Sequence, residues 1–205
     1  MKTKIPILIT FIMVMVLLIG GCVPLKSLHP LFTEEDVIFD SGLVGKWRKT
    51  TDKDKNETFE FRKLEDNNYL VITSEKEVPT GMLEGHLLKL GEYTFLDLSI
   101  SKENTRLIIK DFPDKEFPVI YNYAIELHTF HRVLIESDTL RMGFLSSQWF
   151  GDMRRENKIN INYAIVEDSH LLTDSTKVLQ EFVTKYADDE KAFVLDKYYR
   201  LKEGN

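Results

Sequence analysis

The sequence predicts a mainly β fold: an antiparallel barrel or strongly curved sheet with a packed amphipathic helix near the C-terminus. The chain has 205 residues, enough for one sizeable domain plus appendages. Short runs of β-favouring, partly alternating residues recur with turn residues between them, and one late stretch has helical spacing. The composition, 43% hydrophobic and 29% charged, excludes disordered, collagen-like and polytopic membrane proteins.

Two hairpins are expected in the first half of the chain. Residues 58–72 form the first, around a polar turn cluster at residues 65–68. Residues 82–100 form the second, in which the pair Gly91-Glu92 joins two apolar runs. Consecutive hairpins of this kind are typical of up-and-down barrels and of sandwiches.

The longest expected strand covers residues 123–136, and its two faces differ. One face carries Tyr123, Ile125, Leu127, Thr129, His131, Val133 and Ile135. This face is expected to point inward, because alternate residues of a strand share a face and the other face carries more charge. The irregular stretch at residues 112–118 contains two prolines and is expected to lie across a barrel mouth.

Two helices and further strands are expected after residue 137. A strand over residues 139–145 leads to Ser146 or Ser147, either of which could cap a short helix. A strand at 160–166 and a brief one at 171–172 precede the clearest helix, which begins near Asp174 or Ser175. Its apolar stripe consists of Val178, Leu179, Phe182, Val183 and Tyr186. A final strand is expected at residues 192–201.

Residues 1–22 have the order of a secretory signal peptide: a basic start, an apolar run of about 15 residues, then small residues. The run is shorter than the roughly 20 residues of a membrane-spanning helix. Ile19-Gly20-Gly21-Cys22 resembles the lipobox of bacterial lipoproteins. The resemblance implies cleavage before Cys22, with a diacylglyceryl group on its sulfur and an acyl chain on its amine. The alternative is a plain secretory signal with an incidental cysteine, although Cys22 is the only cysteine and has no disulfide partner within the chain.

The expected organisation is therefore a signal peptide at 1–21, an acylated cysteine with a partly docked tether at 22–40, and a β domain at 41–205. Loss of Lys2 and Lys4 with the leader would change the net charge from −6 to −8. Attachment to the membrane would then depend on the acyl chains. The acidic balance excludes nucleic acid as a partner. Val23 stands where Asp would retain a Gram-negative lipoprotein in the inner membrane, so the resemblance implies the cell envelope, and the outer membrane in a Gram-negative host.

Gly45-Lys46-Trp47, at the start of the first strand after the tether, is similar to the Gly-x-Trp motif of lipocalins. The resemblance implies that Trp47 closes one end of a barrel and that an arginine covers it. Arg141 is the candidate for that arginine, with Arg132 the alternative. The chain lacks the mid-chain Thr-Asp-Tyr motif and the disulfides of lipocalins, and has an extra helix and strand before its main helix. Residues 30–36, the Gly-x-Trp and residues 128–133 together resemble a group of uncharacterised bacterial lipoproteins with no assigned activity.

No catalytic motif is present in the sequence, so the protein is not expected to be an enzyme. His128 and His131 are three apart on a strand and face opposite sides, which argues against a metal site. No cofactor is expected other than the covalent lipid on Cys22.

Two functions remain open. The first is binding of a small apolar or amphipathic ligand inside the barrel, with Phe95, Tyr123, Thr129 and His131 as lining residues. The second is assembly with other envelope proteins, with a packed barrel, no ligand and His131 as a satisfied core residue.

Overall fold

The computed structural model describes residues 23–50, 57–64, 67–100 and 125–202. Its strands are β1 (Lys26–Ser27), β2 (Gly45–Lys49), β3 (Thr58–Lys63), β4 (Tyr69–Glu75), β5 (Val78–Leu90), β6 (Tyr93–Ser99), β7 (His128–Glu136), β8 (Thr139–Phe144), β9 (Tyr163–Val166), β10 (Ser169–Leu172) and β11 (Asp196–Arg200). The helices are α3 (Ser147–Arg155) and α4 (Thr176–Lys185). No helix in these ranges is both long and apolar enough to cross a bilayer.

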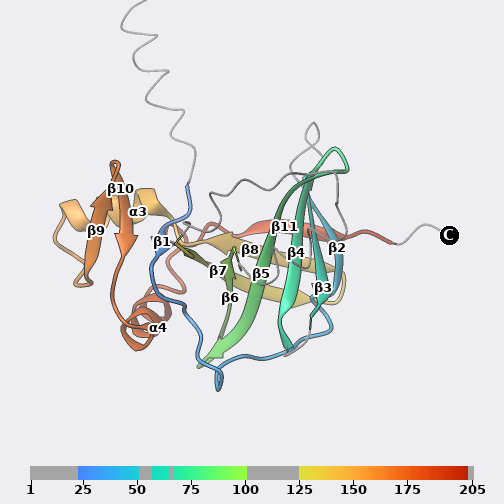
Figure 1. Cartoon of the computed structure of the whole chain (residues 1–205), viewed down its shortest axis with the longest axis horizontal. Helices are drawn as coiled ribbons and strands as arrows, with labels where there is room; N and C mark the ends of the chain where they lie inside the picture. Colours follow the sequence, from blue (N-terminus) through green and yellow to red (C-terminus); the bar gives the residue numbers. More distant parts are fainter. Residues whose placement is uncertain (1–22, 51–56, 65–66, 101–124, 203–205) are drawn as a thin grey trace, which may run out of the picture.

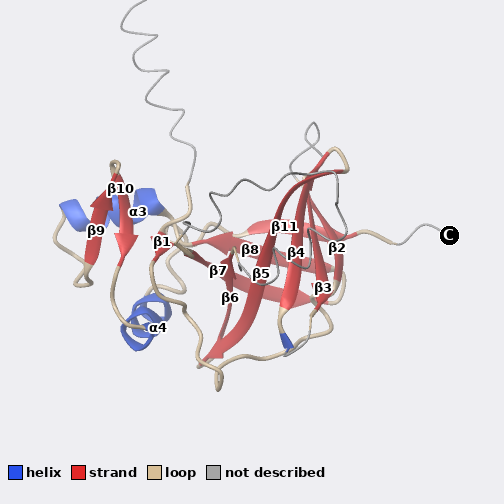
Figure 2. Ribbon diagram, viewed as in Figure 1, coloured by secondary structure: helices blue, strands red, loops and turns tan. Residues whose placement is uncertain are grey.

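Eight strands form a closed antiparallel barrel, which confirms the predicted fold class. Strands β2 to β8 follow one another around it, and β11 fills the place between β8 and β2. Pairing of β6 with β7, from Thr94↔Val133 to Ser99↔His128, closes the cylinder. In Figure 2 the two helices and the β9–β10 hairpin stand at one side of the barrel.

The predicted hairpins are confirmed as β3–β4 and β5–β6. The predicted short helix is α3, and Ser146 caps it by accepting a hydrogen bond from the Trp149 amide at 3.2 Å. The predicted longer helix is α4. Three strands begin later than expected: β7 begins at His128, β9 at Tyr163 and β11 at Asp196.

Two hydrophobic cores lie on opposite sides of the barrel wall. The inner core fills the barrel and contains Leu43, Trp47, Phe61, Tyr69, Val71, Leu87, Leu96, Leu98, Val133, Leu140, Met142 and Tyr198. The outer core lies between the wall and the segment that links β8 to β11, residues 145–195, which we call the insertion. It contains Leu25, Leu31, Leu88, Phe95, Phe130, Leu145, Trp149, Phe150, Leu172, Leu179, Phe182, Val183, Ala187, Ala192 and Phe193. Strands β5, β6 and β7 contribute to both, so their two faces are buried.

The N-terminal segment, residues 23–40, is docked on the domain at several points. Strand β1 pairs with β7 on one side and with β10 on the other (Figure 1). Leu25 and Leu31 are buried in the outer core. The described part of the expected tether thus docks through its apolar residues, which cover the outer face of the barrel wall, while Val23 and residues 33–35 stay exposed.

The inserted segment returns to the barrel by crossing β8 at Gly143. A Cβ atom at this position would lie 2.1 Å from the Val194 carbonyl oxygen, closer than any real contact. Only glycine therefore allows the chain to pass so near the wall before it enters β11.

Candidate functional site

Thr129 and His131 lie on the same face of β7 as Val133, which belongs to the inner core. The Thr129 hydroxyl and His131 Nε2 are 3.2 Å apart and hydrogen-bonded. The His131 ring also contacts Phe144 edge-on, with centroids 6.1 Å apart. Burial lowers the pKa of His131 to about 4, so the ring is neutral at pH 7. His131 thus has a hydrogen-bond partner, as expected for a core residue that binds no ligand.

Phe95, another proposed lining residue, does not join them. Phe95 points to the opposite side of the wall, where it packs 5.8 Å from Phe193 in the outer core. The expectation that Phe95 faces the barrel interior is wrong, because its neighbours Leu96 and Leu98 take the inner face. Tyr123 and the loop at 112–118 lie outside the described residues.

The inner core is filled with large side chains. Trp47, Phe61 and Tyr69 are fully buried there together with leucines of β5, β6 and β8. The two pockets described below, one beside Trp149 and one beside Arg132, both lie outside the barrel. The candidate binding site therefore lies on the outer wall.

Arg200, not Arg141, covers Trp47. The Arg200 guanidinium lies 4.2 Å from the Trp47 ring and donates to the carbonyls of Gly42 and Val44. Register explains the contact, because Arg200 of β11 is paired directly with Trp47 of β2. Arg141 is instead an exposed residue of β8 that pairs with Glu136 at 3.3 Å. The alternative candidate, Arg132, lies on the outer wall above Tyr93.

Gly45 is required by this arrangement. Its φ of +127° is a conformation that side-chain-bearing residues rarely adopt. A Cβ atom there would also lie 2.8 Å from the Arg200 guanidinium. Glycine, tryptophan and arginine therefore act as one unit at this end of the barrel.

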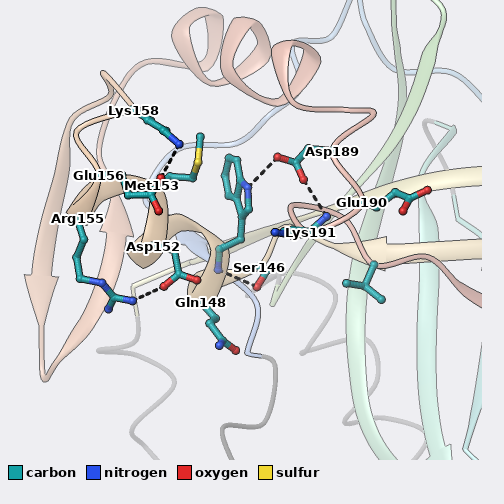
Figure 3. Close-up of a pocket in the computed structure, with 12 residues that line it drawn as sticks. Ser146, Gln148, Asp152, Met153, Arg155, Glu156, Lys158, Asp189, Glu190 and Lys191 are labelled. Carbon is teal, nitrogen blue, oxygen red and sulfur yellow. Dashed lines mark hydrogen bonds and ion pairs between the residues drawn. The ribbon is translucent and has the colours of Figure 1, made fainter.

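The first outer pocket, which we call the Trp149 groove, lies between α3 and the turn at residues 188–191 (Figure 3). Its volume is about 620 Å³, and Trp149 and Met153 contribute its apolar surface. Most of its charged groups are paired with one another: Arg155 with Asp152, and Lys158 with Glu156 at 2.6 Å. Asp189 accepts from the Trp149 indole at 3.0 Å. Such internal pairing leaves little charge available for a ligand.

The second outer pocket, which we call the Arg132 groove, lies on the outer face of β7 and β8 and has a volume of about 490 Å³. Its lining consists of Arg132, Leu134, Arg141, Ala187, Asp188, Asp189, Glu190, Phe193, Val194 and Leu195. The lining therefore combines apolar side chains with two arginines and three carboxylates.

Arg132 is 8% exposed, which is unusual for a guanidinium. It stacks 4.6 Å above the Tyr93 ring, and its Nη1 donates to the Val133 carbonyl at 3.2 Å. Its Nε is buried and has no hydrogen-bond partner among the described residues. Burial lowers the pKa of Arg132. A buried guanidinium with an unpaired donor can donate a hydrogen bond to an acidic group.

A second polar cluster lies on the outer wall under the N-terminal segment. The Asp97 carboxylate is buried, accepts the Leu31 amide at 2.7 Å and lies 2.9 Å from His128 Nδ1. Burial alone would lower the pKa of His128, but Asp97 and Glu126 raise it. Phe32 stacks on His86 with ring centroids 3.7 Å apart. This cluster holds the N-terminal segment to the barrel.

These arrangements give no metal centre within the described ranges, where no three His, Cys, Asp or Glu side chains converge on one point. His131 lies inside the wall and His128 outside it. The sequence signal for Arg132 was its place on the charged face of a long strand, but its burial depends on the insertion. Arg200 had no comparable local signal.

No protein family, no curated protein sequence and no solved structure matches this chain.

Proposed function

We propose that the protein is a lipid-anchored component of the bacterial cell envelope that binds a small amphipathic ligand in the Arg132 groove. Its anchor would be the acylated Cys22, and no catalytic role is proposed. A β-barrel is typical of binding proteins, and the binding surface in this proposal is the outer wall. The observation that carries the proposal is the buried, incompletely paired Arg132 in a pocket of ligand size.

The groove also suggests which ligand would fit. Leu134, Phe193 and Leu195 would hold an apolar body, while Arg132 would hold an acidic group. Asp188, Asp189 and Glu190 line the same groove and would repel a multiply charged anion. The favoured ligand class is therefore an amphiphile with one carboxylate or one phosphodiester.

The second candidate is an assembly lipoprotein, in which the groove receives a segment of another envelope protein. The filled inner core favours it, because a packed barrel can serve as a scaffold without any internal ligand. In this case the groove would also hold an apolar group and one acidic group, but both would belong to a polypeptide.

Native mass spectrometry of the full chain, purified from detergent-solubilised membranes, tests both candidates. We expect a co-purifying amphiphile on the wild type and its loss from Arg132→Gln. Arg62→Gln is the matched control, because Arg62 is exposed on β3 and pairs with Glu60 away from the groove. The same spectra report whether the chain begins at an acylated Cys22.

The possible outcomes separate the candidates. An envelope protein captured by the wild type and lost from Arg132→Gln, with no small molecule present, would support assembly instead. Equal ligand content in all three proteins would contradict the Arg132 site. Melting temperatures of the variants show whether a loss of ligand merely reflects unfolding.

A further inference from the structure

The described chain is fixed to the domain from its first residues. The Val23 carbonyl accepts from the Ser147 amide at 3.0 Å, and the Leu25 amide donates to the Leu145 carbonyl at 2.7 Å. Pro24 forms a bridge with Ser146. Cys22 is one residue from Val23, and consecutive Cα atoms are about 3.8 Å apart. A lipid on Cys22 would therefore leave the protein from a defined point on its surface, with almost no slack.

The β9–β10 hairpin lies beside this point. Strand β1 runs parallel to β10, with Lys26 opposite Leu171 and Ser27 opposite Leu172. Val23 bonds to Ser147, the first residue of α3. This helix packs on β10 through Phe150 and His170, whose ring centroids are 5.2 Å apart. Figure 1 shows the hairpin turn and the start of the described chain on the same side of the molecule.

The end of this hairpin exposes apolar side chains on both faces. Ile165 is 59% exposed and Val166 is 51% exposed, although neighbours in a strand point to opposite faces. Val23, next to the anchor, is 55% exposed. Tyr163, at the other end of β9, packs against the outer core. The end of the hairpin thus exposes apolar side chains on the side of the molecule where the described chain begins, next to the cysteine that would carry the acyl chains.

The turn is tight and acidic. Glu167 and Asp168 both have positive φ, 47° and 64°, as in the two-residue turns that match strand twist. Their carboxylates would be repelled by anionic headgroups and attracted by the ammonium groups of zwitterionic ones. The bilayer that fits this surface is therefore a zwitterionic one with little anionic lipid.

We propose that the end of the β9–β10 hairpin rests in the headgroup region of the bilayer beside the acylated Cys22, where Ile165 and Val166 form a second membrane contact. This inference rests on the lipid anchor of the proposed function. The two contacts together hold the protein in one orientation on the membrane. The lipid anchor alone would let the domain rotate about a single point.

Site-specific fluorescence tests the contact. Cys22 is the only cysteine and its sulfur would be blocked by lipid, so an introduced cysteine can be labelled alone. Val166→Cys and the control Val178→Cys each replace an exposed valine, and Val178 lies on α4, away from the hairpin turn (Figure 1). Both labelled lipoproteins are placed in phosphatidylethanolamine–phosphatidylcholine vesicles containing a lipid with a nitroxide on its headgroup.

We expect severalfold stronger quenching at position 166 than at position 178, and weaker quenching at position 166 when anionic lipid replaces the ethanolamine lipid. Equal quenching at the two positions, with acylation of Cys22 verified by mass, would overturn the hairpin contact and leave the anchor intact. An unmodified Cys22 would overturn the anchor and this inference together.

Discussion

The inner and outer cores use opposite faces of the same strands but are assembled in different ways. In β6, Leu96 and Leu98 face the inner core, while Phe95 and the buried Asp97 face outward. The inner core is built almost entirely by strands that follow one another along the chain. The outer core needs residues 23–40 and the insertion before β11, which are distant in sequence. Alternation within a strand therefore predicts the first core and says little about the second.

Two histidines of β7, one on each side of the wall, have pKa values shifted in opposite directions. His131, on the inner side, is neutral because burial depresses its pKa. His128, on the outer side, has a raised pKa because Asp97 and Glu126 outweigh the effect of burial. The stability that His131 contributes is present above its unfolded pKa of 6.5 and is lost as the pH falls toward 4. The contribution of His128 is present below pH 6.5 and is lost as the pH rises through its folded pKa.

The largest effect is expected from breaking the inner core at Trp47. Trp47→Ala should lower the free energy of unfolding by about 3 to 5 kcal/mol, the range for truncation of a large buried aromatic residue. The indole is fully buried and donates to the Leu43 carbonyl at 2.8 Å. Urea denaturation followed by circular dichroism measures the loss. The control is Tyr199→Ala on β11, where the side chain is exposed and a change below about 1 kcal/mol is expected.

A smaller effect, specific to pH, is expected at His131. A fall in pKa from 6.5 to about 4 implies that acidification from pH 7 to 4.5 removes roughly 2 to 3 kcal/mol of stability through this residue. His131→Leu should be less stable than the wild type at pH 7, because Thr129 loses its partner. The variant should lose less stability on acidification. Unfolding curves at both pH values check this, and parallel losses in the two proteins would contradict the buried, neutral state.

The sequence predicted most of the barrel because hairpins and alternation are local signals. Thr129 and His131 were assigned to the correct face because polar Glu126, His128 and Arg132 marked the other one. Phe95 was assigned to the wrong face because its side chain is apolar, although Asp97 and Ser99 share its face of β6 and make that face the more polar one. Both faces of β6 are buried, so an apolar side chain can lie on either. The contacts of the N-terminal segment could not be predicted from the sequence, since its partners, among them Gln180 and Asp97, lie far along the chain.

The arginine that covers Trp47 could not be predicted from local signals either. Its identity depends on the register between two strands about 150 residues apart in sequence. Arg200→Met should cost about 1 to 2 kcal/mol, since two carbonyls lose a charged donor and the indole loses its stacked cation. Arg141→Met removes only an exposed ion pair with Glu136, so we expect a change within about 0.5 kcal/mol. Thermal unfolding of the two variants side by side measures the difference. Equal losses would mean that Arg200 contributes no more than a surface charge, and that Trp47 closes the barrel without help from an arginine.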